Sequence, residues 1–178
     1  MNSRAHQNIA LIGFMGSGKS SVGRLLAKKL RFHFVDTDRM VVERAGRQIT
    51  EIFNEQGEPF FREQERLALE SLRGQRRLVV ATGGGIVMQP ENVALLRELA
   101  FVVWLSASEE IIFERVSRND RRPLLHTPNP RKTIAALLAQ RRPLYESAAH
   151  FCVETSRRPH AEVAGAILRE FRDMSAES

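Results

Sequence analysis

The scarcity of cysteine and of long apolar runs in this sequence excludes several classes of protein. Its single cysteine, Cys152, has no partner within the sequence, which excludes a disulfide-stabilised scaffold. No apolar run approaches the length that crosses a bilayer, and the run before Gly13 is too short for a signal peptide. We therefore expect a cytoplasmic protein, with Cys152 in the strand-like run 151–153 as a buried and unreactive side chain.

Aromatic side chains that stack on bases are also scarce, with one Trp and one Tyr. Lys and Arg number 27 against 21 Asp and Glu, a formal charge of +6, which favours anionic partners such as nucleotides, nucleic acid or acidic metabolites. The basic residues are scattered along the sequence and form no tract, so a nucleotide-dependent nucleic-acid binder is the weaker alternative. We expect small-molecule partners, neither nucleic acid nor membrane, and a monomer.

The sequence does contain a phosphate-binding motif. Residues 13–20 are Gly-Phe-Met-Gly-Ser-Gly-Lys-Ser and fit the pattern G-x-x-x-x-G-K-[ST], between a strand-like run at 8–12 and a helix-like run at 21–30. The glycines allow backbone N–H groups to point at phosphate oxygens, and the helix N-terminus adds partial positive charge. Lys19 is expected to neutralise the β- and γ-phosphates and Ser20 to bind Mg²⁺. The nucleotide-binding residues expected here are Gly16, Ser17, Gly18, Lys19, Ser20 and Ser21.

Apolar runs alternate with helical patterns along all 178 residues, without repeats or linkers. This alternation predicts an α/β fold with a five-stranded parallel sheet flanked by helices, in one domain spanning 1–178. Ligands gather at the carboxyl ends of the strands in such a sheet. The expected strands are 8–12, 32–35, 78–82, 101–105 and 151–154, and the expected helices are 21–30, 58–73, 91–99, 108–117, 131–148 and 160–171.

Two acids, Asp36 and Asp38, follow the second strand-like run. Phosphoryl transfer needs a carboxylate near Mg²⁺ and a group that orients or deprotonates the accepting hydroxyl. Either acid could instead be the N-cap of the next helix. Many P-loop proteins place a metal-binding Asp after a later strand, but here the run 78–82 leads into three glycines without an acid. Asp36 is therefore the nearest candidate for the metal.

Two further features favour a binding site. Gly83, Gly84 and Gly85 would weaken any regular element, so they indicate close approach to the backbone. Arg62 has Glu58 and Glu65 on the same predicted helix face, and a guanidinium held in this way suits a carboxylate. A solvated surface ion pair is the plainer alternative.

The segment 115–131 is polar, rich in arginine and interrupted by proline. It is either a mobile surface loop or a lid that closes over a nucleotide and excludes water.

In this order and spacing, the motifs resemble the shikimate kinase family over residues 9–171. The resemblance is carried by residues 13–20, 36–38, 57–65, 83–85, 122–125 and 141–145. It implies a fold like that of nucleoside monophosphate kinases, with an acceptor-binding region at about 37–65 and a mobile lid at about 115–131. It also implies transfer of the γ-phosphoryl group of ATP to the 3-hydroxyl of shikimate, with Mg²⁺, in aromatic amino acid biosynthesis.

The resemblance assigns roles to individual residues. Catalysis would rest on Lys19, on Asp38 at the accepting hydroxyl, and on Arg122, which reaches the phosphates from the lid. Arg115 would stack on the adenine and Arg158 would lie on its other side, although the spacing there departs from the family. The substrate-binding residues implied are Asp38, Arg62, Gly83, Gly84, Gly85 and Arg141, with Ile49, Phe53 and Phe61 as an apolar wall.

Two alternatives stay open. Ile49 and Phe53 are four residues apart, a spacing that equally fits core packing. A gluconate or nucleotide kinase of the same build is the nearest competing function, and Arg62, Arg141 and the three glycines argue against it.

Overall fold

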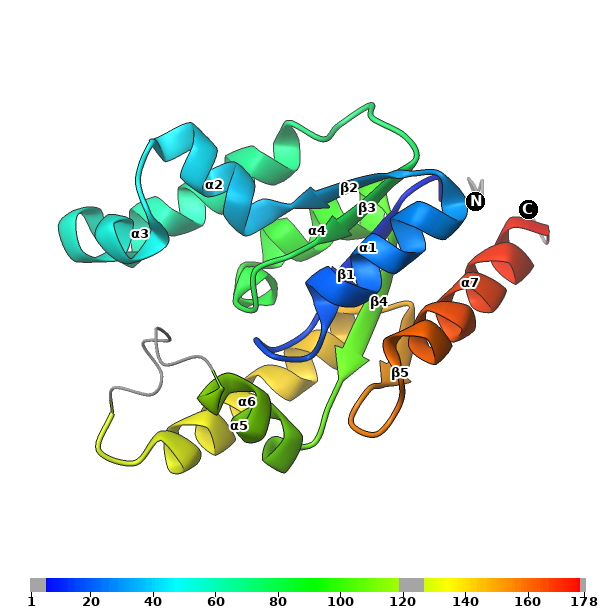
Figure 1. Cartoon of the computed structure of the whole chain (residues 1–178). Coiled ribbons are helices and arrows are strands. Elements are labelled where there is room, and N and C mark those ends of the chain that lie inside the picture. The colour runs from blue at the N-terminus through cyan, green and yellow to red at the C-terminus, as the bar shows by residue number, and fades with distance from the viewer. Residues whose placement is uncertain (1–5, 119–126, 177–178) are drawn as a thin grey trace.

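The computed structural model describes residues 6–118 and 127–176. Its centre is a five-stranded, fully parallel sheet with the order β2-β3-β1-β4-β5, which confirms the predicted α/β architecture (Figure 1). The strands are β1 (Ile9–Ile12), β2 (His33–Asp36), β3 (Leu78–Ala81), β4 (Phe101–Ser106) and β5 (Phe151–Glu154). β1 lies between β3 and β4, with Ile9 opposite both Val79 and Phe101. The loop that follows β1 therefore emerges at the middle of the sheet's carboxyl edge.

Helices cover both faces of this sheet because its strands are apolar on both sides. The described helices are α1 (Lys19–Leu30), α2 (Thr37–Ala45), α3 (Ile49–Glu70), η1 (Ile86–Met88), α4 (Pro90–Leu99), α5 (Glu109–Ser117), α6 (Pro130–Ala148) and α7 (His160–Ala176).

The alternation of β1 divides the core into two layers. Ile9 and Leu11 pack with α1 and α7 on one face, whereas Ala10 and Ile12 pack with α4, α5 and α6 on the other (Figure 1). All four side chains are fully buried, and each large one contributes about 1.5–3 kcal/mol by leaving water. A strand apolar on both faces thus fixes the position of the loop that follows it.

The helix predicted at 58–73 is wrong in its bounds. α3 begins at Ile49 and ends at Glu70, and it is bent at Gly57, whose φ of 80° and ψ of 174° are not helical. Gly57 and the following Pro59 mark where a second helical segment starts, since proline is tolerated in a first turn. The sequence pattern found this second segment only, and it missed α2 and the first half of α3.

The prediction that Cys152 is buried is also wrong. Its side chain is exposed because β5 is an edge strand and period-2 alternation places Cys152 opposite to the buried Val153. Only the Val153 side packs against the α1–α7 layer. Partial burial of the thiol still raises the pKa of Cys152, which fits an unreactive cysteine.

Among the helices that the structure describes, none has the length and apolar character needed to cross a bilayer.

Candidate active site

The predicted phosphate-binding loop connects β1 to α1 as expected. Gly16 and Gly18 adopt φ values of 80° and 98°, in the region that glycine alone enters without strain. Lys19 is the first residue of α1 and is buried, and its Nζ donates to the carbonyl oxygens of Gly13 at 2.7 Å and Phe14 at 2.9 Å. These bonds hold the ammonium group beneath the loop, at the N-terminus of a twelve-residue helix.

A cavity of ≈ 530 Å³ opens beside this loop. It brings together the loop after β1, the acids after β2, the glycines after β3 and the end of α5, as expected for the carboxyl edge of a parallel sheet. Its lining residues are Met15, Gly16, Gly18, Lys19, Ser20, Ser21, Asp36, Asp38, Thr82, Gly84, Arg115, Arg118 and His160.

Asp36 is both an N-cap and a neighbour of Ser20. Its Oδ1 accepts hydrogen bonds from the backbone N–H of Asp38 at 3.1 Å and of Arg39 at 3.3 Å, which caps α2. Its Oδ2 accepts from Ser20 Oγ at 3.3 Å. The capping alternative is therefore right for Asp36, and it leaves the second carboxylate oxygen facing the phosphate-binding loop.

These two oxygen donors fit a magnesium site of the nucleotide type. Mg²⁺ prefers oxygen ligands and is commonly bound through one or two protein groups, with phosphates and water completing its shell. In the described ranges, no three His, Cys, Asp or Glu side chains gather as they would around an all-protein metal site. Ser20 and Asp36 could thus hold the metal together with a nucleotide.

Asp38 lies in the first turn of α2 and lines the cavity beside the phosphate-binding loop. Burial, and next to it the charge of Asp36, raise the pKa of Asp38, while Lys19 and Arg62 oppose the shift. A carboxyl group with a raised pKa accepts a proton more readily than an exposed one. Two cations on either side nevertheless favour its ionised form.

Arg62 is fixed by acids one helical turn before and after it. Its Nη1 donates to Glu65 Oε2 at 2.6 Å, and its Nη2 donates to Glu58 Oε1 at 2.8 Å. Glu65 is fully buried, and burial raises its pKa while Arg62 lowers it. The surface ion-pair alternative is wrong for Arg62, because its side chain is only 12% exposed. The predicted support by Glu58 and Glu65 is confirmed.

The three glycines are approached closely, as predicted: Gly84 by the backbone of the phosphate-binding loop, and Gly83 and Gly85 by side chains of this site. A Cβ on Gly83 would lie 2.6 Å from Asp38 Oδ1 and 2.8 Å from Glu65 Oε1. A Cβ on Gly85 would lie 2.7 Å from both Nη atoms of Arg62. A larger residue at Gly83 or Gly85 would displace these acids or the arginine.

Arg141 reaches the same glycine loop from α6. Its Nη1 donates to the Gly84 carbonyl at 3.4 Å, and its guanidinium lies 5.5 Å from the centre of the Phe14 ring. Tyr145, one turn further along α6, donates its hydroxyl to the same carbonyl at 2.5 Å. Burial raises the pKa of Tyr145 to about 12, so its hydroxyl remains a donor. Arg62 and Arg141 therefore both contact the segment 83–85.

The apolar residues assigned to a wall form part of a small cluster between α2 and α3. Phe61 is buried with Val41 and Ile52, and Ile49 packs against this group. Phe53 is 38% exposed, with its ring centre 4.7 Å from that of Phe61. Ile49 therefore packs in the core, as its spacing allowed, while one side of the Phe53 ring is open to solvent.

The arginines assigned to the adenine lie in different surroundings. Arg115 lines the cavity and donates to the carbonyls of Gly16 at 3.2 Å and Thr155 at 3.0 Å, which ties the end of α5 to the loop. Arg158 is exposed and does not line the cavity. Arg122 lies outside the described residues, as does the lid between 119 and 126.

Several residues of the site were missed by sequence reasoning. His160 lines the cavity, with its Nε2 3.4 Å from the position of a Cβ on Gly18. Thr155 donates to the carbonyls of Ser17 and Ser106, and Thr37 accepts from the Gly83 N–H. His160 and Thr155 belong to no recognisable pattern, and Thr37 lay inside the motif 36–38 without a predicted role of its own. Tyr145 lay inside a motif but had no charge or spacing that indicated its contact.

One edge of the parallel sheet holds three features: a glycine loop over a buried lysine, oxygen donors for a metal, and a pair of arginines. These features define the protein as an ATP-dependent P-loop kinase that acts on a small molecule. A sequence model of the shikimate kinase family matches residues 15–172. The chain belongs to the shikimate kinase family.

Curated relatives and solved structures agree with this assignment. The chain is 45% identical over 169 residues to the shikimate kinase of Thermodesulfovibrio yellowstonii, covering 95% of this chain and 97% of that protein. It is 49% identical over 166 residues to that of Moorella thermoacetica, covering 93% and 92%. The structure of shikimate kinase from Acinetobacter baumannii in complex with shikimate matches with a TM-score of 0.89 at 38% identity, over 94% of each chain.

A gluconokinase from Sinorhizobium meliloti matches with a TM-score of 0.63 at 18% identity, over 98% of this chain and 99% of that one. At this identity it shares the fold alone.

Proposed function

We propose that this chain transfers the γ-phosphoryl group of ATP to the 3-hydroxyl of shikimate, giving ADP and shikimate 3-phosphate. The observation that carries the proposal is the position of Asp38. It lines the same cavity as Lys19, and its Oδ1 lies beside Gly83 together with Glu65, the partner of Arg62. Lys19 belongs to the phosphate-binding loop and Arg62 to the acceptor side. Asp38 therefore lies where a hydroxyl of a substrate bound by Arg62 would meet a phosphate bound by Lys19.

The phosphate side works by positioning and charge neutralisation. The N–H groups of Gly16, Gly18 and Ser20 and the ammonium of Lys19 bind the phosphates, as the geometry of the loop and the start of α1 favours. Ser17 and Ser21 complete this loop. Mg²⁺ neutralises charge on the transferring group when bound, and Ser20 and Asp36 are the residues that hold it.

The acceptor side recognises a carboxylate and ring hydroxyls. Arg62 and Arg141 contact the glycine loop 83–85 and together bind the carboxylate of shikimate with planar guanidinium groups. Phe53 and Phe61, with Ile49 behind them, cover the apolar side of the ring. The bare backbone at 83–85 leaves space next to this position.

Asp38 orients the 3-hydroxyl and accepts its proton as the new P–O bond forms. Burial raises the pKa of Asp38, which favours proton acceptance, and Lys19 and Arg62 keep it ionised before the reaction. The proton moves from the substrate oxygen to a carboxylate oxygen, and ADP leaves with the electrons of the broken P–O bond.

The proposal also covers the contacts with the nucleotide, the location of the protein in the cell and its oligomeric state. Arg115 contacts the adenine, Arg122 reaches the transferring phosphoryl group from the lid, and Arg158 lies near the other side of the base. The chain acts as a cytoplasmic monomer on its two small substrates, without nucleic acid or membrane. Sedimentation at assay concentration tests the monomer.

A coupled ADP-release assay over a panel of acceptors tests the function. We expect turnover of shikimate and none of gluconate or nucleoside monophosphates. Lys19→Ala is the control that removes phosphate neutralisation, and it should abolish turnover. Turnover of gluconate or a nucleoside monophosphate without turnover of shikimate would contradict the proposal.

A further inference from the structure

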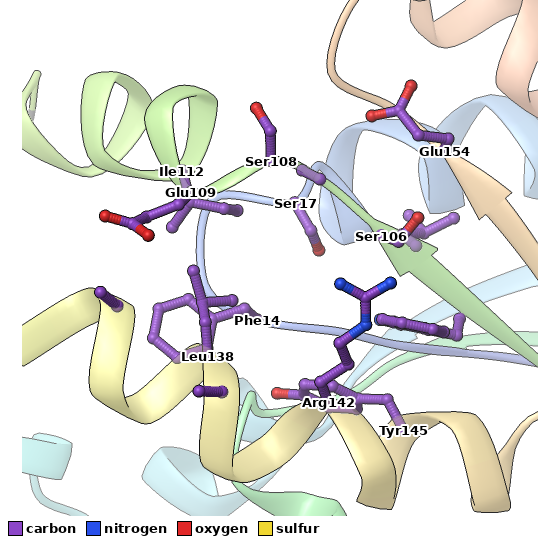
Figure 2. A pocket seen from close by; sticks show the side chains of 15 residues that line it. Phe14, Ser17, Ser106, Ser108, Glu109, Ile112, Leu138, Arg142, Tyr145 and Glu154 are labelled. Atoms are coloured by element: carbon purple, nitrogen blue, oxygen red, sulfur yellow. The ribbon is translucent and has the colours of Figure 1, made fainter.

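A second cavity of ≈ 450 Å³ lies between the C-terminal end of β4, the first turn of α5 and the middle of α6 (Figure 2). It shares none of its lining residues with the nucleotide cavity. Its volume is in the range of cavities that bind small molecules. Of its lining residues, Phe14 and Ser17 belong to the phosphate-binding loop and Tyr145 donates to the Gly84 carbonyl, and the proposed reaction gives the others no role.

The walls of this cavity are mainly apolar and aromatic. Phe14 and Leu138 both line it (Figure 2), and Leu138 packs against the apolar cluster that contains Phe14. Trp104 and Tyr145 stack with ring centres 5.9 Å apart. Flat apolar walls of this kind favour an aromatic ring, which gains contact area with little loss of conformational freedom.

One polar group in the cavity lacks a partner. Ser17 is 1% exposed, and within residues 6–118 and 127–176 nothing forms a hydrogen bond with its Oγ. Figure 2 shows this hydroxyl pointing into the cavity. A buried hydroxyl without a partner destabilises the protein, so a ligand that supplies an acceptor oxygen here would be favoured.

A positive charge lies opposite this hydroxyl. The guanidinium of Arg142 points from α6 toward Ser17 and Ser106 (Figure 2). The side chain is 71% exposed, and its Nε donates to Glu146 Oε1 at 3.1 Å, which leaves the Nη groups toward the cavity (Figure 2). Glu109 and Glu154 stand at the rim. Arg142 attracts an anion, whereas Glu109 and Glu154 repel one. The cavity therefore accepts at most a single negative charge, held directly by the guanidinium, and disfavours a phosphate dianion.

We propose that this cavity binds an aromatic monocarboxylate. The ring packs against Phe14 and Leu138, and the carboxylate accepts hydrogen bonds from Arg142 and from Ser17 Oγ. Ser17 belongs to the phosphate-binding loop, where its backbone carbonyl accepts a hydrogen bond from Thr155. A ligand bound to Ser17 therefore contacts the loop that binds ATP. Such a contact couples the two sites, and each ligand then changes the affinity for the other by the same factor.

A ¹⁹F NMR titration of the full chain with 4-fluorophenylacetate, without nucleotide or shikimate, tests the site. The neutral analogue 4-fluorophenylacetamide keeps the ring and removes the charge. We expect saturable binding of the acid, with a Kd at least tenfold lower than that of the amide. Arg142→Gln should remove this difference, because only the acid uses the guanidinium.

A filling variant locates the binding. Ala139 lines the mouth of the cavity and is exposed, so Ala139→Phe blocks the space without disturbing the core, and it should raise the Kd of the acid at least tenfold. Ala136→Phe, on an exposed position of the same helix outside the cavity, is the matched control and should bind as the wild type does.

Absence of saturable binding, equal affinity for acid and amide, or undiminished binding to Ala139→Phe would each overturn the proposal. Because binding is measured without substrates, its failure is distinguishable from a failure of the proposed kinase activity.

Discussion

Asp38 is the residue whose removal separates chemistry from binding. Asp38→Asn keeps the size of the side chain but cannot accept the proton, so we expect kcat to fall by about 100-fold or more. Nucleotide affinity should change little, because Asp38 is not part of the phosphate-binding loop. Steady-state kinetics with shikimate, together with titration of an ATP analogue, measure both. Near-normal turnover would show that another group takes the proton.

Arg62 is predicted to act on shikimate affinity. Arg62→Ala removes the guanidinium and leaves the buried Glu65 without its cation, so we expect KM for shikimate to rise by about tenfold to 100-fold, the range for a lost charge-assisted hydrogen bond. Arg62→Lys keeps the charge but not the planar fork, and it should rescue only part of the loss. An unchanged KM for shikimate in Arg62→Ala would contradict the assignment.

At the residue scale, most of the site was predictable because the groups with charge or unusual backbone carry the signal. The lysine of the loop, the acids after β2 and the glycines after β3 each depart from what a regular element would hold. His160 and Thr155 were not predictable, because their roles depend on how the start of α7 and the loop after β5 fold against α1 and α5. Cys152 was misplaced since its sequence shows an apolar run but not which strand lies at the edge.

At the scale of elements, the glycine loop between β3 and α4 depends on its lack of side chains. A methyl group on Gly83 would press on Asp38 and Glu65, so Gly83→Ala should lower kcat by about tenfold or more through displacement of the acid. Gly165→Ala in α7 is the matched control, since a Cβ there meets only Arg169 at 3.8 Å and alanine favours the helix. Turnover measured beside circular dichroism separates activity from folding. Equal turnover in both variants would contradict the claim that Gly83 is needed to leave space for Asp38.

The contact between β4 and the start of β5 makes stability depend on pH. His150 Nδ1 accepts the backbone N–H of Val102 at 2.9 Å, and burial, with Arg97 and His6 nearby, lowers the pKa of His150 to about 4. The unfolded chain therefore binds a proton more readily, and stability is lost as pH falls from about 6.5 through 4.

We expect a loss of about 1 kcal/mol from this bond between pH 7 and pH 4, the net value of one hydrogen bond. Urea unfolding at the two pH values measures it. His150→Asn offers an acceptor that does not titrate and should lose less over the same interval, whereas His33→Asn, far from this contact, is the control. An equal loss in wild type and His150→Asn would contradict the role.

α3 shows why boundaries of elements are harder to predict than their presence. Glycine and proline at 57 and 59 predict a break, yet the first segment from Ile49 packs on α2 through Ile52 and Val41, so tertiary contacts extend the helix on both sides of the bend. The acceptor side of the site is built on this bent helix, since Arg62 and Glu65 follow the bend.

For the whole molecule, the parallel sheet follows from the hydrophobic pattern, but the site follows from the order of the strands. Alternating apolar strands and helices predict a parallel sheet covered on both faces. They do not predict that β3 lies between β1 and β2, which places the glycines between the phosphate-binding loop and the acids. The resemblance of the ordered motifs implied the type of fold, and the structure adds this order of strands.

A crystal structure with ADP, Mg²⁺ and shikimate tests the central claim most directly. The account predicts that the shikimate carboxylate contacts Arg62 and Arg141, and that its 3-hydroxyl lies within hydrogen-bonding distance of Asp38 and faces the nucleotide phosphates. A shikimate molecule bound away from Arg62 and Arg141, or with its 3-hydroxyl turned away from Asp38, would contradict it.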